Sequence, residues 1–409
     1  MNLDYKKIFI IGLGFFSISI IWAIYNVAVP IYLKDLGLSG VFVGAIMTID
    51  NVFAIVLLPV FGALSDRTYT RYGRRMPFLL VGVPLSAVAF FVLPFTRMNL
   101  VLLMTSVIAL NFFMSIYRAP TVALMPDVTP RPLRSKANGI INLMGGLGTA
   151  VSFLLSGLLF SIGEPVPYAV GAVILFITIM IMYNQIREPK EIHDDLEEKE
   201  SVSSNTANED GQFLSLIFIL LAIFFWFSGF NVVETFFSTY GEEVLGIDKS
   251  MASFLLLTFS AVFLIFAIPS GFIAEKFGRK KTIFLGLIIL TATFISLIFI
   301  RQVSVMFVLL GIGGLSWALI NINSYPMVVE MTSNKGIGKY TGYYYFFAML
   351  ASIVSPILYG FLKDRLGDTF LFIYSSVAVV IAFFFMMLVK HGEAKPIVKS
   401  AFENIEHME

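Results

Sequence analysis

Long apolar stretches, each about as long as a bilayer is thick, recur along the whole 409-residue chain. A helix needs about 20 apolar residues to cross a hydrocarbon core of ~30 Å. The first run is expected to remain as a spanning helix, because it is far longer than the core of a signal peptide and no small-residue cleavage site follows it. In all we predict twelve membrane-spanning helices, at residues 8–33, 41–63, 77–96, 99–123, 137–162, 166–186, 213–240, 251–274, 282–300, 303–331, 338–362 and 368–390.

The composition favours an all-α membrane protein, since 58% of the residues are hydrophobic and only 13% are charged. A soluble domain cannot bury that much apolar surface, whereas helices surrounded by lipid need not bury it. A net charge of +1 gives no reason to expect a nucleic acid partner. The chain has no cysteine, and His193, His391 and His407 all lie outside the apolar runs. We therefore expect no enzyme, no cofactor and no metal site.

A polar segment separates the predicted helices into two sets of six. Residues 187–212 contain nine acids and three bases and are otherwise rich in Ser, Asn and Thr, a composition typical of a solvated linker. We predict an N-terminal six-helix bundle at residues 1–186, an acidic cytoplasmic linker at 187–212, a C-terminal six-helix bundle at 213–390 and a cytoplasmic tail at 391–409.

The two halves repeat each other at a nearly constant spacing. Asn26 and Asn231 lie 205 positions apart, and Gly139 and Gly342 lie 203 apart. Four more pairs have a similar spacing, and their members occur in the same order in both halves: Trp22 with Trp226, Gly73 with Gly278, Pro120 with Pro326 and Asp127 with Glu330. Chance does not produce an ordered series of this kind, so we predict two pseudo-symmetric bundles related by an internal repeat.

Lysine and arginine are concentrated on one side of the predicted helices. If the loop between Pro59 and Phe78 is cytoplasmic, 21 of the 28 basic residues lie on the cytoplasmic side and 6 on the other. Cytoplasmic loops of membrane proteins carry such an excess. We therefore expect a multi-pass monomer in the lipid bilayer of the cell (inner or plasma) membrane, with both termini cytoplasmic.

Three ionisable residues, Asp50, Arg118 and Glu234, fall inside predicted spans. A charge at mid-bilayer costs at least ~2.5–3.5 kcal/mol, so each side chain must face a cavity or a partner. The rise of the helix places both acids in the outer half of the membrane and Arg118 nearer the cytoplasm. An acid without a close cation in apolar surroundings can take up and release a proton near neutral pH. We predict that Asp50 and Glu234 couple proton movement to transport; the alternative is that they are static hydrogen-bonded acids that stabilise helix packing.

Aromatic and amide side chains share helical faces in predicted helices 1, 7 and 10, and Arg118 shares a face with Asn111 in helix 4. Aromatic planes beside amides suit a sugar, which has an apolar C–H face and a ring of hydroxyls. A guanidinium offers five donors to such hydroxyls. The alternatives are a gating ion pair for Arg118 and ordinary packing for the tryptophans. We predict as substrate-binding residues Trp22, Asn26, Asn111, Arg118, Trp226, Asn231, Trp317 and Asn321.

Acids and bases also gather at the cytoplasmic ends of the predicted helices, at positions that match between the two halves. We expect ion pairs among them to close the cytoplasmic side when the cavity faces outward; the alternative is exposed charges of little energetic value. This predicted cytoplasmic gate consists of Asp66, Arg74, Arg75, Asp127, Glu275, Arg279, Lys280 and Glu330.

The six-plus-six repeat, the acidic linker and a loop that contains Gly62-x-x-Ser65-Asp66-Arg67 and Gly73-Arg74-Arg75 together resemble the major facilitator superfamily. The resemblance implies a cavity between the halves, lined by helices 1, 4, 7 and 10, and alternating access. The segment 65–78, Tyr117-Arg118-Ala119 and Glu234-Thr235 are similar to the sucrose-transporter and glycoside–pentoside–hexuronide cation symporter branches. In the sucrose carriers the matching arginine is tied to sugar binding.

The resemblance and the polar residues predict a secondary active transporter, specifically a proton-coupled symporter of a glycoside or disaccharide. Two alternatives stay open: an exporter of drugs or lipophilic compounds with the same fold, and a sodium-coupled sugar symporter. Leu58 and Ala54 stand where the melibiose-type sodium carriers have acids, and residues 142–148 lack the Gly-Pro motif of drug–proton antiporters.

Overall fold

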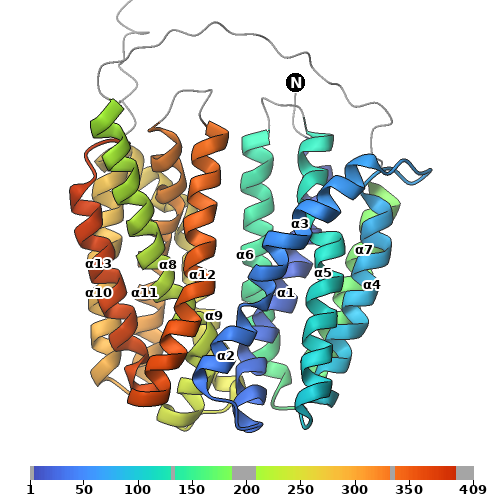
Figure 1. Ribbon diagram of the computed structural model, residues 1–409, viewed down its shortest axis with the longest axis horizontal. Coiled ribbons are helices and arrows are strands. Elements are labelled where there is room, and N and C mark those ends of the chain that lie inside the picture. The colour runs from blue at the N-terminus through green and yellow to red at the C-terminus, as the bar shows by residue number, and fades with distance from the viewer. Residues whose placement is uncertain (1–3, 130–133, 187–208, 332–336, 393–409) are drawn as a thin grey trace, which may run out of the picture.

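The computed structural model describes residues 4–129, 134–186, 209–331 and 337–392, which are almost entirely helical (Figure 1). In these ranges twelve helical segments are long and apolar enough to cross a membrane. The predicted all-α membrane fold is therefore confirmed. Most of the predicted linker (187–208) and tail (393–409), with His193 and His407, lies outside the described residues.

Each predicted span except the second corresponds to one long helix. The first half contains α1 (Tyr5–Asp35), α2 (Gly40–Met47), α3 (Ile49–Arg67), α4 (Met76–Val92), α5 (Leu100–Val128), α6 (Arg134–Leu159) and α7 (Val166–Gln185). The second half contains α8 (Glu209–Leu245), α9 (Lys249–Phe277), α10 (Arg279–Phe299), α11 (Val303–Val329), α12 (Ile337–Leu366) and α13 (Leu371–Leu388). Helix α8 begins at Glu209, so the last four residues assigned to the linker are helical.

The two halves pack their helices in equivalent ways. Helix α1 lies against α6 and α7, as α8 lies against α12 and α13, and α4 contacts α5 and α7, as α10 contacts α11 and α13. Figure 1 shows α8, α10, α11 and α13 gathered on one side of the molecule and α3, α4, α5 and α7 on the other. This arrangement is the one expected for two repeats of six spans.

The second predicted span is broken into two helices. Thr48 separates α2 from α3, and its φ of −97° and ψ of 0° lie outside the helical range. Its backbone N–H turns back to the carbonyl of Ala45, and its hydroxyl donates to the same carbonyl at 2.9 Å. Because a threonine hydroxyl can bond the backbone in this way, it competes with the helical pattern. The break brings the residues that begin α3 to the centre of the protein.

We call the face at which α7 ends and α8 begins the linker face, and the opposite one the far face. The halves meet where α1 contacts α8, α2 contacts α12 and α6 contacts α9. Glycines allow the α2–α12 contact at the far face, since a Cβ on Gly360 would collide with the carbonyl of Gly40, and one on Gly44 with that of Pro356. The backbones of the two halves therefore touch directly at this end.

Candidate functional site

A polar cavity of about 280 Å³ lies between the two halves. Its walls come from α1, α2, α3, α5 and α6 of the first half and from α8 and α12 of the second. The cavity brings together the three ionisable residues found inside spans, Asp50, Arg118 and Glu234. Further hydrogen-bonding groups come from Ser19, Asn26, Asn51, Thr149, Asn231, Thr235 and Ser352, and Trp22 provides an aromatic wall.

Asp50 reaches the cavity because it occupies the first turn of α3, directly after the break at Thr48. A carboxylate at this position is favoured by the partial positive charge of the helix N-terminus. The side chain of Asn51 donates to its Oδ1 at 3.0 Å. Arg118 attracts Asp50 electrostatically, although no ion pair within 4 Å joins them in the described part of the chain. The two groups face one cavity with room for a ligand between them.

Arg118 enters the cavity from α5, and its guanidinium carbon lies 5.9 Å from the ring centroid of Trp22, within the range of a cation–π contact. Among the described residues its side chain makes no hydrogen bond and has no carboxylate within 4 Å. Its donors are therefore available to a molecule in the cavity. The sequence-based depth estimate had placed Arg118 away from Asp50 and Glu234, whereas all three line the same space.

Glu234 comes from α8 and faces the first half of the molecule. Its Oε1 accepts a hydrogen bond from the amide of Asn26 at 3.4 Å, which is long for such a bond. The negative charge of Asp50 lies close enough to repel it. Asn231, one turn earlier on α8, donates to the hydroxyl of Ser352 at 2.9 Å and not to Glu234. Glu234 is thus held weakly and can change partner when the cavity fills.

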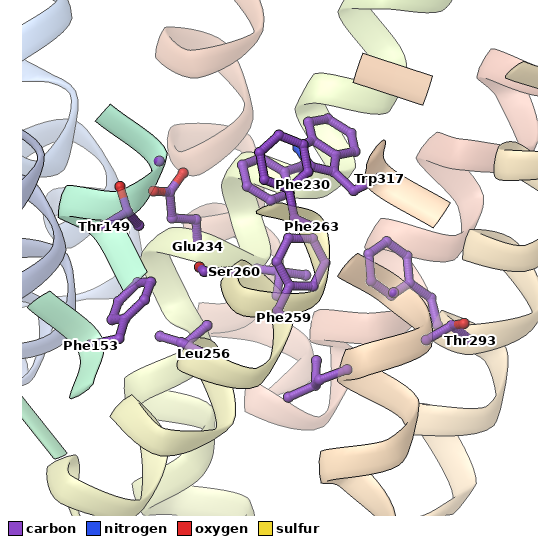
Figure 2. Close-up of a pocket in the computed structure, with 15 residues that line it drawn as sticks. Thr149, Phe153, Phe230, Glu234, Leu256, Phe259, Ser260, Phe263, Thr293 and Trp317 are labelled. Carbon is purple, nitrogen blue, oxygen red and sulfur yellow. The ribbon is translucent and has the colours of Figure 1, made fainter. Parts of the chain in front are cut away.

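A second pocket, of about 200 Å³, adjoins the polar cavity (Figure 2). Six of its fifteen lining residues are aromatic. Among them, Phe230 and Trp317 stack with ring centroids 4.2 Å apart and planes at 8°, and Phe259 and Phe263 also line the pocket. Glu234 lines both this aromatic pocket and the polar cavity, as does Thr149 of α6. The two spaces therefore meet at these residues.

Three of the residues predicted to bind substrate lie away from both spaces. Trp226 is fully buried and lines neither space; it lies beside the helical face that carries Asn231 and Glu234. Asn111 is 2% exposed and donates to the carbonyl of Val107 at 2.9 Å. Asn111 lines neither the polar cavity nor the aromatic pocket. Asn321 lines neither the polar cavity nor the aromatic pocket.

The structure also adds cavity residues that the sequence did not single out. Asn51 follows Asp50, but only the break at Thr48 turns it inward. Thr149 follows the glycine-rich residues 142–148 of α6. Ser352 reaches the cavity from α12 and carried no signal in the sequence.

At the linker face of the first half, four charged residues of the predicted gate form one cluster. Asp127 accepts from Nε of Arg75 at 2.9 Å and from Nη2 of Arg74 at 3.1 Å, while Asp66 pairs with Arg75 at 2.5 Å. Arg75 is only 4% exposed and also donates to the hydroxyl of Ser65. Burial lowers the pKa of Arg75, but its bonds to Asp127 and Asp66 outweigh this and raise the pKa above its ordinary value.

At the linker face of the second half, Arg279 pairs with Glu330, the repeat mate of Asp127. Lys280 donates to the backbone carbonyl of Val389. Glu275 forms no ion pair within 4 Å in the described part of the chain. Every one of these described ion pairs lies within a single half, so none of them joins the two halves in this conformation.

The far face, in contrast, carries ion pairs between the halves that the sequence did not suggest. Glu164, at the end of the first half's α6–α7 connection, accepts from Lys249 of α9 at 2.7 Å. The same carboxylate also pairs with Arg97 at 3.4 Å and accepts from the hydroxyl of Tyr32 at 2.5 Å. Glu164 is therefore the centre of a cluster that ties α9 to the first half.

Two more side chains, those of Lys34 and Asp364, make polar contacts between the halves at the far face. Lys34 of α1 pairs with Glu242 at 2.8 Å and with Glu243 of α8. Asp364 of α12 accepts from the backbone N–H groups of Gly40 at 2.5 Å and of Val41 at 3.1 Å. This carboxylate binds the free N–H groups that begin α2, where a negative charge is favoured.

Two overlapping segments of the chain, residues 11–256 and 242–405, match the Major Facilitator Superfamily. The protein belongs to this superfamily. As a member of the major facilitator superfamily it is a multi-pass membrane transporter and not an enzyme. Within the described residues no cluster of three or more His, Cys, Asp or Glu could hold a metal ion.

Several members of the superfamily are similar to this chain. It is 23% identical to an uncharacterized MFS-type transporter, YxiO, of Bacillus subtilis, over 84% of this chain and 83% of that protein. It is 21% identical to the class H tetracycline resistance protein of Pasteurella multocida, over 78% of each. It is 22% identical to the isoprimeverose transporter of Lactiplantibacillus pentosus, over 63% of this chain and 56% of that protein. These relatives do not single out the sucrose-type branch.

The fold is also similar to that of a solved transporter. A crystal structure of a bacterial homologue of the human lysosomal transporter Spinster, in an inward-facing and occupied conformation, superimposes with a TM-score of 0.74. The match covers 95% of this chain and 97% of that one, at 15% sequence identity. At this identity the likeness establishes the shared major facilitator superfamily fold.

Proposed function

We propose that this transporter is a proton-coupled sugar symporter that works by alternating access and carries glycosides or disaccharides. The observation that carries the proposal is the polar cavity between the halves, where Asp50, Arg118 and Glu234 meet without an ion pair among the described residues. Two carboxyls, a guanidinium and the amides of Asn26 and Asn231 offer both donors and acceptors to a ring of hydroxyls. Trp22 offers a flat wall to the apolar face of a sugar.

Proton coupling rests on the two acids. A carboxylate removed from bulk water is costly in its charged form unless it has a partner. Glu234 has only the long hydrogen bond from Asn26, and the charge of Asp50 repels it. Uptake of a proton by Glu234 removes both the cost of desolvating its charge and the repulsion by Asp50. Protonation becomes more favourable when a bound sugar displaces water from the cavity.

Alternating access fits the distribution of polar contacts over the two faces. Described hydrogen bonds and ion pairs join the halves at the far face and at Asn26–Glu234, while the gate ion pairs at the linker face stay within a half. We infer that this conformation opens toward the linker face. The excess of Lys and Arg at that face supports a cytoplasmic position for this face and for both termini. We propose the plasma membrane as the location.

The test is reconstitution of the purified protein into liposomes, with a panel of labelled mono- and disaccharides and glycosides. An inward proton gradient is expected to drive accumulation of at least one sugar above its external concentration. Accumulation driven only by a sodium gradient would replace the proton by sodium as the coupling ion. Absence of uptake and counterflow for every sugar in the panel would reject the proposed cargo.

Two variants assign the roles in that assay. Arg118→Ala is expected to weaken sugar binding about 10- to 100-fold, because hydrogen bonds from a charged donor are lost, whereas the exposed Arg301→Ala leaves binding unchanged. Glu234→Gln is expected to keep counterflow but lose proton-driven accumulation, since a glutamine cannot carry the proton. Asp35→Asn, which removes an exposed acid outside both the cavity and the predicted gate, provides the control.

A second function, export of lipophilic compounds, is favoured by one specific observation, the aromatic pocket beside Glu234. A pocket walled by Phe230, Phe263 and Trp317 suits a flat apolar molecule. The relative named as a tetracycline resistance protein adds to this alternative. Proton-driven extrusion of a lipophilic dye from inverted vesicles, with no sugar uptake, would favour it over the symporter.

A further inference from the structure

Two spaces of opposite character share a wall at the centre of this transporter. The polar cavity holds Asp50, Arg118 and Glu234, while the aromatic pocket is formed mainly by Phe230, Phe259, Phe263 and Trp317. From this juxtaposition we infer that the cargo is an amphiphilic glycoside, with its sugar in the polar cavity and a planar apolar aglycone in the aromatic pocket. The inference rests on the proposed function and narrows it from sugars in general to aryl-type glycosides.

Size is the first argument for a single ligand that spans both spaces. Binding sites for small molecules have volumes of about 300–1,000 Å³. The polar cavity, at about 280 Å³, and the aromatic pocket, at about 200 Å³, each fall below that range. The two spaces adjoin at Glu234 and Thr149, which line both, and their combined volume falls within the range. A sugar alone would leave the aromatic pocket without an occupant.

Shape is the second argument. The rings of Phe230 and Trp317 are stacked, with centroids 4.2 Å apart and an angle of 8° between their planes. Each ring covers one face of the other, so the stack offers the pocket an outer ring face and ring edges as an apolar surface. Phe259 lies 5.7 Å from Phe230 between ring centroids, so the surface continues along α9. Planar groups gain from offset-stacked and edge-to-face contact with such rings. A linear or strongly polar substituent would gain much less from the same walls.

The boundary between the spaces is the third argument. Figure 2 shows Glu234 and Thr149 on one side of the pocket and Phe230, Phe263 and Trp317 on the other, with Ser260 between them. A ligand that crosses this boundary therefore meets hydrogen-bonding groups where its glycosidic bond would lie and aromatic rings beyond it. Glu234 is placed to accept a hydrogen bond from the sugar hydroxyl next to that bond.

The test compares matched ligands on the intact protein. Methyl and p-nitrophenyl glycosides of the same sugars are titrated against the purified transporter, with p-nitrophenol as the probe for the aglycone alone. The nitrophenyl glycoside of the accepted sugar is expected to bind at least about tenfold tighter than the methyl glycoside, the gain that burial of one aromatic ring gives.

A pair of phenylalanine variants tests whether the tighter binding of the nitrophenyl glycoside arises in the aromatic pocket. Phe230→Leu keeps an apolar side chain but removes the ring that forms the pocket wall. Phe227→Leu removes a ring that also touches Trp317, at 5.3 Å between centroids, but does not line the pocket. The tenfold advantage is expected to disappear in Phe230→Leu and to persist in Phe227→Leu, while methyl glycoside binding changes less than about twofold in both.

The three tryptophans of the chain report where the aglycone lies, because Trp22 lines the polar cavity, Trp317 the aromatic pocket and Trp226 neither. In variants that keep one tryptophan, with phenylalanine at the other two positions, the nitrophenyl group is expected to quench Trp317 more strongly than Trp22. Stronger quenching of Trp22 would overturn the inference.

The remaining outcomes separate this inference from the function on which it rests. Equal affinity for methyl and nitrophenyl glycosides would overturn the amphiphilic cargo and leave the sugar symporter in place. Binding of p-nitrophenol without binding of any glycoside would overturn both and favour export of lipophilic compounds.

Discussion

The linker face and the far face of this transporter both carry ion pairs between acidic and basic side chains, but these pairs connect different parts of the molecule. At the linker face Arg75 pairs with Asp66 and Asp127, all within the first half, and Arg279 pairs with Glu330 within the second. At the far face Glu164 pairs with Lys249 and Lys34 pairs with Glu242, each across the boundary between the halves. One face therefore stabilises each bundle, while the other fixes how the bundles stand relative to each other.

The difference predicts two kinds of defect. Loss of a contact within a half lowers the stability of that bundle in every conformation. Loss of a contact between halves changes only the balance between the conformations that have it and those that lack it. The following substitutions test this distinction, in order of decreasing expected effect.

The largest effect is expected from Arg75→Ala. This guanidinium is 4% exposed, and its removal leaves the partly buried Asp127 without its Nε partner. Breaking a buried ion pair from one side costs about 3 kcal/mol or more, so thermal unfolding in detergent should occur at a clearly lower temperature. Arg71→Ala, in the same loop but exposed, is the control and should unfold as the parent does. An unchanged Arg75→Ala transition would mean that the linker-face cluster does not stabilise the bundle.

Contacts between the halves need a measurement of conformation. The chain has no cysteine, so cysteines introduced at the exposed positions Asp35 and Arg365 take up spin labels alone. The first belongs to the first half and the second to the other, both at the far face. The distance between the labels then reports whether this face is closed or open.

Gly360→Ala is expected to have the largest effect on that distance. The added methyl group would collide with the carbonyl of Gly40, so α2 and α12 cannot keep their approach. Overpacking of this kind costs about 1–3 kcal/mol, which should make the longer, open distance the main one. Gly271→Ala is the control, because a Cβ there meets no atom within 4 Å. A distance distribution like that of the parent would show that glycine is not needed at this contact.

Glu164→Gln should have the next largest effect. The side chains of Glu164 and Lys249 are 21% and 16% exposed. The free energy of this ion pair is therefore expected to lie between that of an exposed pair and that of a buried pair. Removal of the charge should shift the ratio of open to closed molecules about tenfold, or ~1.4 kcal/mol. Glu330→Gln removes an ion pair within the second half and should leave the far-face distance unchanged. If both variants shift the distance equally, the two faces do not differ in the way proposed.

The fold was largely predictable from the sequence, and so was the charged part of the polar cavity. Twelve apolar runs are a strong signal because a bilayer sets their length. Asp50, Arg118 and Glu234 were identifiable because a charge in an apolar run needs a cavity or a partner. The break at Thr48 was not predicted, since nothing in the sequence marks this threonine as the residue whose φ and ψ leave the helical range.

The aromatic pocket and the far-face contacts could not have been predicted in the same way. Phe230 and Phe259 are two of 42 phenylalanines, most of which pack in the core or face lipid. Glu164 and Lys249 lie 85 positions apart, and Gly40 and Asp364 lie 324 apart. Nothing in one sequence links such residues, because their meeting depends on how the two halves are placed.

The smallest shift is expected from Lys34→Gln. This lysine joins the halves through Glu242 and Glu243, but its side chain is 27% exposed and theirs are 42% and 44% exposed. Water and salt screen such pairs, so the loss should be about 0.5 kcal/mol, or roughly a twofold change in the ratio of open to closed molecules. The shift should vanish at high salt, whereas that of Gly360→Ala, which is steric, should persist. A Lys34→Gln effect that is as large as that of Glu164→Gln and independent of salt would contradict this prediction. It would mean that the solvent exposure of an ion pair does not determine how strongly the pair stabilises the closed far face.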